Sequence, residues 1–172
     1  MILDNLTFVQ FCSLNQEERE IYQEAYLSVE PFDCVDCETW TWGNVKEVQD
    51  ILAGQMNQGD VLAIAKKECR YLNQNSQAHI IYSAFNAIKN SIKKISEAES
   101  KEWASPITPK QEQALADVGG FDVFRAIPQT LHLSKLLGIS YNEVLKQPWD
   151  LCFAVYSYDV RFAAYNALIL KP

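Results

Sequence analysis

Two cysteines three positions apart are the first candidates for chemistry in this chain of 172 residues. Cys34 and Cys37 form a C-x-x-C motif, which occurs in zinc sites and in redox dithiols. A structural zinc site needs four ligands, and Cys69 and His79 would complete one only by chance of folding. A redox dithiol would need a neighbouring βαβ pattern, and the sequence has none. We expect thiols that fill apolar space, with a metal site at Cys34 and Cys37 as the alternative.

The two histidines, His79 and His132, show no catalytic context. Neither lies near a serine or cysteine motif, so a nucleophilic triad is not supported. We interpret both as surface residues or as core residues with satisfied hydrogen bonds. No phosphate-binding glycine pattern is present, and Gly119-Gly120 is better explained as the end of a helix.

Neighbouring carboxylates are the remaining candidates for acid–base chemistry. Glu17 and Glu18, and likewise Glu97 and Glu99, are expected on solvated helix faces. Such faces provide no apolar setting that would separate the pKa values of a pair. The sequence therefore predicts a protein that is not an enzyme and needs no cofactor.

The charge is acidic overall but unevenly distributed. The net charge is −7, which makes nucleic acid an unsuitable partner because phosphate binding needs a concentrated positive field. Residues 1–60 carry −10, residues 61–110 carry +4 and residues 111–172 carry −1. Attraction between the first two segments within one chain explains this pattern, and head-to-tail contact between copies is the alternative. The lysines of residues 89–101 form a basic helix face, which we interpret as solvated, with an anionic partner as the alternative.

Cysteine usage and the N-terminal sequence indicate the compartment. The chain has five cysteines, an odd number, and its first residues, MILDNLTFVQF, lack the pattern of a signal peptide. Free thiols in a reducing cytoplasm are the simplest explanation, and we do not expect secretion.

The C-terminal half is rich in signals that begin and end helices. Thr108 and Ser140 each open a capping box, Gly138 is a helix terminator and Pro148 suits the first turn of a last helix. Pro128 is expected to end a helix. The predicted helices cover residues 111–118, 121–127, 131–137, 141–146 and 149–170.

The last predicted helix is long enough to cross a membrane. It carries Asp150, Asp159 and Arg161, however, and charges at those depths are expensive in lipid. We therefore expect a core helix. Its predicted inward face comprises Cys152, Val155, Tyr158 or Asp159, Phe162, Asn166 and Ile169.

The first hundred residues also follow a helical period. Residues 1–14 are compatible with a strand, a docking arm or a helical turn. Helices are predicted from residue 15 to about 29, with Ile21 and Ala25 inward, from 44 to 54 and from about 60 to 72, and a long one after Ser76. Residues 31–43 lack that period, and a short β element is allowed near residues 34–42.

These elements predict an all-α fold, a compact multi-helix domain. We expect one domain, with an N-terminal helical segment at residues 1–105 and a C-terminal helical segment at residues 106–172. Heavy aromatic residues near the ends of elements are candidates for contact with a protein partner, because such side chains anchor interfaces. They are Trp40, Trp42, Phe121 and Phe124.

The C-terminal half resembles a family of phage proteins. The series DVGGFDVF, IPQTL and LGISYNEVLKQPW, from Asp117 to Trp149, is similar to that of tail assembly chaperones of tailed phages. These have a short helix, a glycine break, a Pro-containing turn and a step into a last helix. The stretch from Thr41 to Val48 is similar to an aromatic-Gly-x-Val opening in related phage proteins.

The resemblance implies a non-enzymatic role in the cytoplasm of a bacterial host. Chaperones of this family bind the helices of the tape measure protein during tail morphogenesis. The resemblance thus implies a protein partner, a homo-oligomer, and no binding to nucleic acid or membrane. A structural virion component, such as a head–tail connector or tail-completion subunit, is one alternative, and a small cysteine-based metal-binding protein is another.

Overall fold

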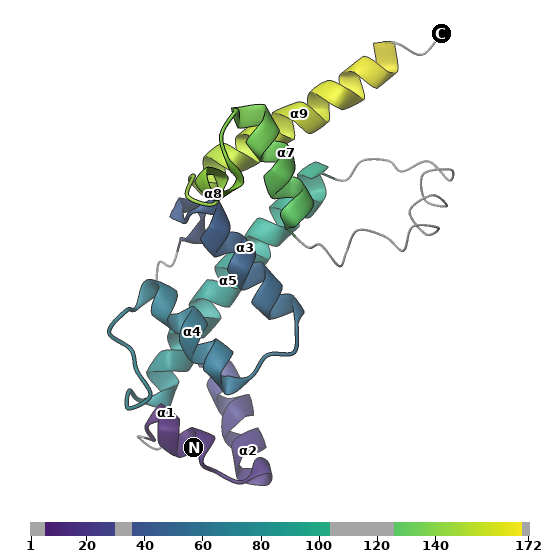
Figure 1. The fold of residues 1–172 in the computed structure, drawn as a ribbon. Coiled ribbons are helices and arrows are strands. Elements are labelled where there is room, and N and C mark those ends of the chain that lie inside the picture. Colours follow the sequence, from purple (N-terminus) through teal and green to yellow (C-terminus); the bar gives the residue numbers. More distant parts are fainter. Residues whose placement is uncertain (1–5, 30–35, 104–125, 170–172) are drawn as a thin grey trace. The chain divides into compact units, whose positions relative to one another are not determined.

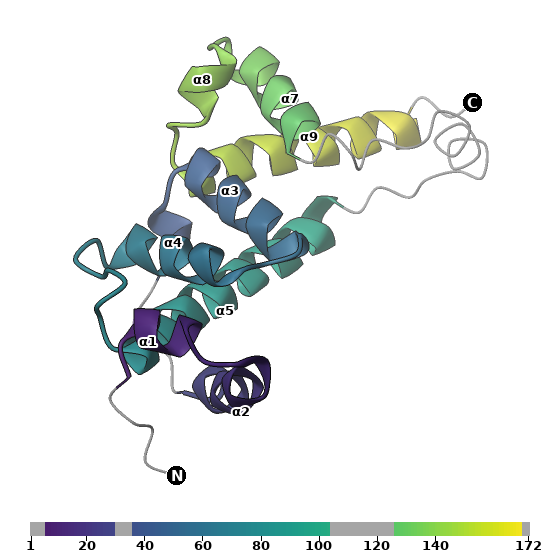
Figure 2. The ribbon, with the colours of Figure 1, turned by 60° about the horizontal axis from the view of Figure 1, so that its bottom comes forward.

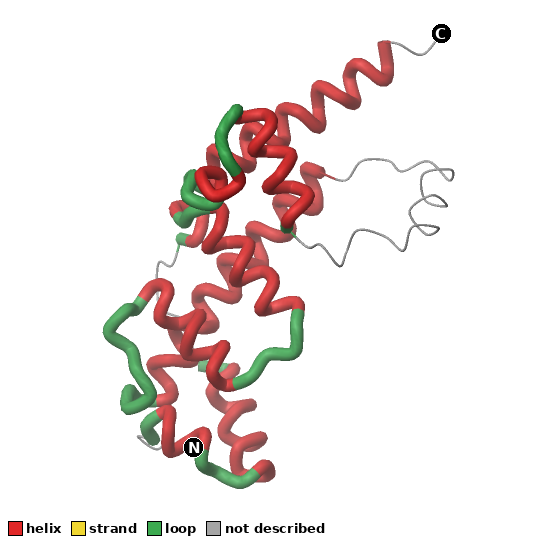
Figure 3. Tube along the Cα trace, in the orientation of Figure 1, coloured by secondary structure: helices red, strands yellow, loops and turns green. Residues whose placement is uncertain are grey.

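The computed structural model describes residues 6–29, 36–103 and 126–169, and these segments are mainly helical (Figures 1 and 3). The all-α prediction is confirmed. No strand occurs among the described residues, which form two isolated antiparallel bridges, Thr7 with Gln77 and Thr41 with Pro148. The helices are α1 (Phe8–Cys12), α2 (Gln16–Leu27), α3 (Trp42–Ala53), α4 (Gln58–Glu68), α5 (Ala78–Trp103), α7 (Ile127–Leu137), α8 (Tyr141–Val144) and α9 (Trp149–Ile169), with the 3-10 turn η1 at Cys37–Thr39.

The chain divides into two compact units, each assembled from segments distant in sequence. Unit 1 comprises residues 1–37 and 51–94, and unit 2 comprises residues 38–50 and 95–172. The long helix α5 contributes its residues 78–94 to unit 1 and the rest to unit 2. This organisation differs from a division at residue 105, because both units combine N-terminal and later segments.

Short-range capping fixes where several helices begin. Reciprocal capping boxes satisfy backbone amides that have no partner inside the helix. The one at Ser140 and Glu143 and the stop at Gly138, which has a φ of 67°, confirm the prediction. The other boxes are Thr7 with Gln10, Asn15 with Glu18, and Asn57 with Asp60.

Unit 1 is built on a cluster of aromatic rings. Tyr26 of α2 stacks on Tyr82 of α5 with ring centroids 5.3 Å apart, and Phe11 of α1 meets both rings edge-on. Next to this cluster, the Asn86 side-chain amide donates to the carbonyls of Tyr26, Leu27 and Val29. These carbonyls belong to the last residues of α2 and to the segment directly after it, so Asn86 joins the C-terminal end of α2 to α5.

In unit 2, backbone hydrogen bonds hold the starts of α3 and α9 together. The amide of Trp149 donates to the carbonyl of Trp40 at 2.8 Å, and that of Trp42 donates to the carbonyl of Gln147 at 2.7 Å. Next along α3, the amide of Gly43 donates to the carbonyl of Leu145 at 2.9 Å. A Cβ atom on Gly43 would lie 2.8 Å from that oxygen, so this approach requires glycine.

Two local predictions are wrong, the first because of tertiary contacts and the second because of the local position of a proline. The described part of residues 34–42 forms η1 and the single bridge at Thr41, since its backbone groups pair with the segment before α9. Pro128 does not end a helix; it lies in the first turn of α7, where its missing amide costs nothing. The predicted helix at 111–118 and most of that at 121–127 lie outside the described residues.

The prediction of inward faces also fails at two places. Ile21 of α2 is 56% exposed, and α2 buries Tyr26. In α9 the buried residues are Trp149, Cys152 and Ser157. Of the predicted inward face, Cys152 is buried, but Tyr158, Phe162 and Ile169 are exposed. Both helices are apolar on more than one side, so periodicity alone could not select the buried side.

Replacing Gly43 with alanine should destabilise the protein by about 1–3 kcal/mol, because the new Cβ would press on a backbone oxygen that cannot rotate away. Chemical denaturation monitored by circular dichroism would measure the change. An unchanged free energy of unfolding would show that the start of α3 and the end of α8 are not held at this distance.

Candidate functional site

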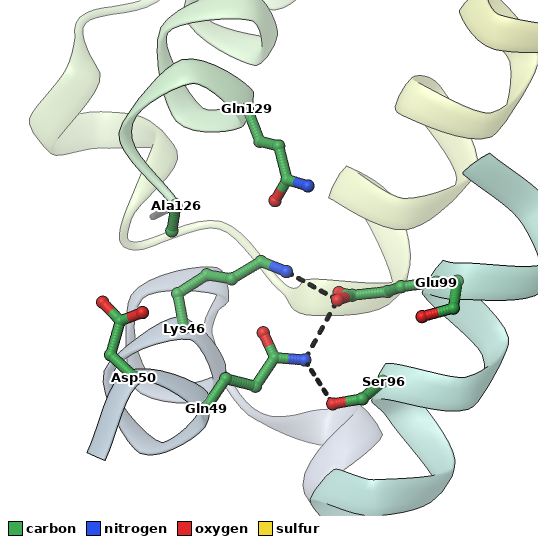
Figure 4. Close-up of a pocket in the computed structure, with 8 residues that line it drawn as sticks. Lys46, Gln49, Asp50, Ser96, Glu99, Ala126 and Gln129 are labelled. Atoms are coloured by element: carbon green, nitrogen blue, oxygen red, sulfur yellow. Dashed lines mark hydrogen bonds and ion pairs between the residues drawn. The ribbon is translucent and has the colours of Figure 1, made fainter. Parts of the chain in front are cut away.

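A buried ion pair lies at the centre of unit 2. Lys46 of α3 and Glu99 of α5 are 6% exposed as residues, and the ammonium nitrogen lies 2.7 Å from the Oε2 atom of the carboxylate. Figure 4 shows the two side chains meeting between their helices. Burying an unpaired charge would cost several kcal/mol, so each group needs the other to remain charged.

The carboxylate of Glu99 accepts hydrogen bonds from three side chains. Besides Lys46, the Gln49 amide donates to Oε2 at 3.0 Å and the Trp149 indole donates to Oε1 at 2.8 Å. These donors come from α3 and α9, while Glu99 belongs to α5. One buried acceptor therefore connects three helices of unit 2.

Two indole rings surround the Lys46 ammonium. Its nitrogen lies 4.4 Å from the ring centroid of Trp42 and 5.2 Å from that of Trp103, within the range of cation–π attraction. Burial lowers the pKa of Lys46, and the neighbouring charge of Glu99 opposes that effect. The site is thus a cation in an aromatic and anionic enclosure.

The indole N–H groups of unit 2 extend the network. Trp42 donates to the hydroxyl of Thr130 in α7 at 2.9 Å, and Trp103 donates to the hydroxyl of Ser157 in α9 at 3.0 Å. Thr130 in turn donates to the carbonyl of Ala126. These partners allow large aromatic groups to be buried without leaving a polar atom unpaired.

A pocket of about 250 Å³ lies beside the ion pair. Figure 4 shows Gln129 on one side and Gln49 and Ser96 on the other. Its lining is mostly polar and comprises Lys46, Gln49, Asp50, Ser96, Glu99, Ser100, Ala126 and Gln129. The oxygens of Glu99 already accept hydrogen bonds from Lys46, Gln49 and Trp149. The ion pair can therefore hold α3 and α5 in place around the pocket without a bound ligand.

The expectation that Glu99 lies on a solvated face is wrong. The signal that could have placed it correctly is its spacing, since Glu99 follows Ile88, Ile92 and Ile95 at intervals of three and four. The position continues the buried stripe of α5. Lys46 likewise lies one turn after Trp42, on the buried side of α3. Only the tertiary structure shows that the buried sides of α3 and α5 meet.

The second candidate is an apolar stripe on α9. We call it the α9 seam and define it as Leu151, Val155, Tyr158, Phe162, Tyr165 and Ile169. Val155 is half-buried, and the other five are between 43% and 69% exposed. Their spacing alternates between four and three residues, which is the spacing of the contact positions of a coiled coil.

Of the predicted partner-binding residues, the structure describes Trp40 and Trp42, and neither belongs to this seam. Trp42 is fully buried in unit 2, and Trp40 is half-buried beside it in the chain. Phe121 and Phe124 lie outside the described residues. The seam was not found from the sequence, because Val155, Tyr158, Phe162 and Ile169 were assigned to the inward face of this helix.

The C-x-x-C motif is described only at Cys37. Its thiol is buried, and its backbone amide donates to the hydroxyl of Ser91 at 3.1 Å. Among the described residues, no group of three or more His, Cys, Asp or Glu side chains is placed to hold a metal ion. Cys34 lies outside the described residues, so a metal site that includes it stays a prediction.

Comparison with protein-family models gives no match, and comparison with curated proteins and with solved structures gives no significant one. The resemblance of the C-terminal half to tail assembly chaperones therefore stays a prediction. Among the described helices, none combines the length and apolar character that crossing a membrane requires.

Removing one member of the buried pair should destabilise the protein more than removing both. Lys46→Met or Glu99→Gln alone should cost about 3–5 kcal/mol, because each leaves the other group without its main partner. The double variant should recover a large part of that loss. Urea denaturation of the three variants tests this, and additive single effects would show that the pair is not coupled.

Two buried thiols should make the protein sensitive to alkali. Burial raises the pKa values of Cys37 and Cys152 from 9.0 to about 11. The folded state thus retains protons that the unfolded state releases, so this contribution is complete below pH 9 and is lost as the pH rises through about 11. If both cysteines are replaced with alanine, the free energy of unfolding should decrease less between pH 9 and about 11 than it does in the wild-type protein. Cys69→Ala is the matched control.

Proposed function

We propose that this protein is a non-enzymatic assembly chaperone that receives an amphipathic helix of a partner protein. The observation that carries the proposal is the α9 seam, a regular apolar stripe exposed to solvent. In the family that the C-terminal half resembles, the partner is the tape measure protein during phage tail morphogenesis. We propose the same class of partner here, bound in the cytoplasm of the bacterial host.

The spacing of the seam specifies a helix as its partner. Side chains at alternating intervals of four and three form one face, and each can insert between four residues of a facing helix. From Leu151 to Ile169 the seam extends over about 27 Å, because a helix rises about 1.5 Å per residue. It therefore suits a partner helix with about three heptads.

The middle of the seam consists of aromatic anchors. The rings of Tyr158 and Phe162 are nearly parallel, at 8°, with centroids 5.9 Å apart, and Tyr165 continues the stripe. Tyrosine side chains carry much of the binding energy at protein interfaces and lose little conformational freedom on binding. The mutual contact of the first two rings already restricts them in the free protein.

Polar contacts outside the seam fix α9 within unit 2. Asp159 pairs with His132 of α7 at 2.8 Å, and Arg161 forms an ion pair with Glu102 of α5. The indole of Trp149 and the hydroxyl of Ser157 bind α5 residues on the buried side. These contacts hold α9 in place before a partner helix binds. Figures 1 and 2 show α9 extending beyond α7 and α8.

The test is co-expression with a tape measure protein, followed by pull-down and titration. The triple variant Tyr158→Ser, Phe162→Ser and Tyr165→Ser should bind about 100-fold or more weakly, because truncating an interface anchor costs about 2 kcal/mol or more. The matched control Ala163→Ser, Ala164→Ser and Ala167→Ser changes three exposed positions of the same helix outside the seam and should bind normally.

Two outcomes would contradict the proposal. One is a wild-type protein that retains no helical partner. The other is mass spectrometry of purified virions that finds the chain in fixed copy number, since a chaperone leaves before the particle is complete.

A further inference from the structure

We infer that the hydroxyl groups of Tyr158 and Tyr165 determine which helices the α9 seam accepts. This inference rests on the proposed function, in which the seam binds a partner helix, and it specifies the chemistry of that helix. The partner presents two side chains with hydrogen-bond-accepting oxygens opposite the two tyrosines, and an apolar side chain between them.

Both phenol groups are solvated in the free protein. Tyr158 is 69% exposed and Tyr165 is 59% exposed. Neither hydroxyl forms a hydrogen bond with the described part of the chain, and the ring of Tyr158 stacks on that of Phe162. A helix that covers the seam removes water from both hydroxyls, which costs binding free energy unless a new partner replaces the water.

The rest of α9 cannot supply the missing acceptors. Side chains on a helix meet those three and four positions away, and for both tyrosines these positions are apolar except for Arg161. A guanidinium group has donors only, so it cannot accept the proton of a phenol. Asp159 and Asn166 directly follow the tyrosines and do not face them, and Asp159 already pairs with His132. The acceptors must therefore come from the partner.

The protein follows the same rule where it buries such groups itself. The Tyr82 hydroxyl donates to the side-chain oxygen of Gln58 at 2.7 Å. The indole N–H groups of Trp42, Trp103 and Trp149 also donate to side-chain oxygens. A buried polar group that loses its partner weakens binding about fivefold or more, so two such groups decide between otherwise similar helices.

The two hydroxyls define a spacing on the partner. Tyr158 and Tyr165 are one heptad apart, which is about 10 Å along a helix, and the ring of Phe162 lies between them in the seam. A partner helix with the order acceptor, apolar, acceptor satisfies both hydroxyls, whereas a wholly apolar stripe leaves both unpaired. Glutamine and glutamate suit the acceptor positions, because both are good helix formers.

The first test removes only the two hydroxyls. The variant with Tyr158→Phe and Tyr165→Phe keeps both rings, and it should bind the tape measure helix retained in co-expression about tenfold or more weakly, because two acceptors then lose their donors. Calorimetric titration measures the change. Tyr71→Phe, at an exposed tyrosine outside the seam, is the matched control and should bind like the wild type. Unchanged or tighter binding by the double variant would overturn the inference, since the hydroxyls would then reach water at the edge of the contact.

The second test changes the partner. A synthetic peptide of the bound helix, with leucine at the two positions that face the tyrosines, should bind the wild-type protein about tenfold or more weakly than the natural sequence does. The phenylalanine variant should reverse this preference, which no folding defect can imitate. A bound helix without acceptors one heptad apart, or the same order of affinities for both proteins, would contradict the inference.

These results separate the inference from the proposed function. If the serine variant of the seam loses the partner helix but the phenylalanine variant keeps it at full affinity, the inference is wrong and the proposed function stands. A wild-type protein that retains no helical partner would overturn both.

Discussion

The buried carboxylate of Glu99 is the constraint on which unit 2 depends. A charge in that position is stable only if donors surround it, and the donors come from Lys46, Gln49 and Trp149. Satisfying one acceptor thus fixes α3 and α9 against α5. The Trp42 and Trp103 rings then cover the Lys46 ammonium, so electrostatic and apolar contacts stabilise the same arrangement.

This network also explains why α9 has two different sides. One side buries Trp149 and Cys152, and near it the indole of Trp103 reaches Ser157. The opposite side is left to solvent with large apolar residues, and we propose that it serves the binding of a partner helix. The hydrogen bond from Trp149 to Glu99 fixes the rotation of α9 about its own axis. That rotation in turn determines that the seam faces the solvent.

Unit 1 achieves its stability by different means. Its core is a group of stacked and edge-on rings around Tyr82, and a single amide, Asn86, joins the end of α2 to α5. On its outside, Glu17, Glu20 and Glu24 of α2 are exposed to solvent.

The sequence by itself determined the helical class and many helix boundaries. Capping residues such as Ser140 with Glu143, and the terminator Gly138, act over three or four residues, so their effect can be read without the fold. It did not determine which side of α9 is buried, because apolar residues surround that helix and periodicity cannot rank its faces. Nor could it pair Lys46 with Glu99, which are 53 positions apart. Only the tertiary structure brought these charges together, because the cost of burying each one depends on the approach of a distant helix.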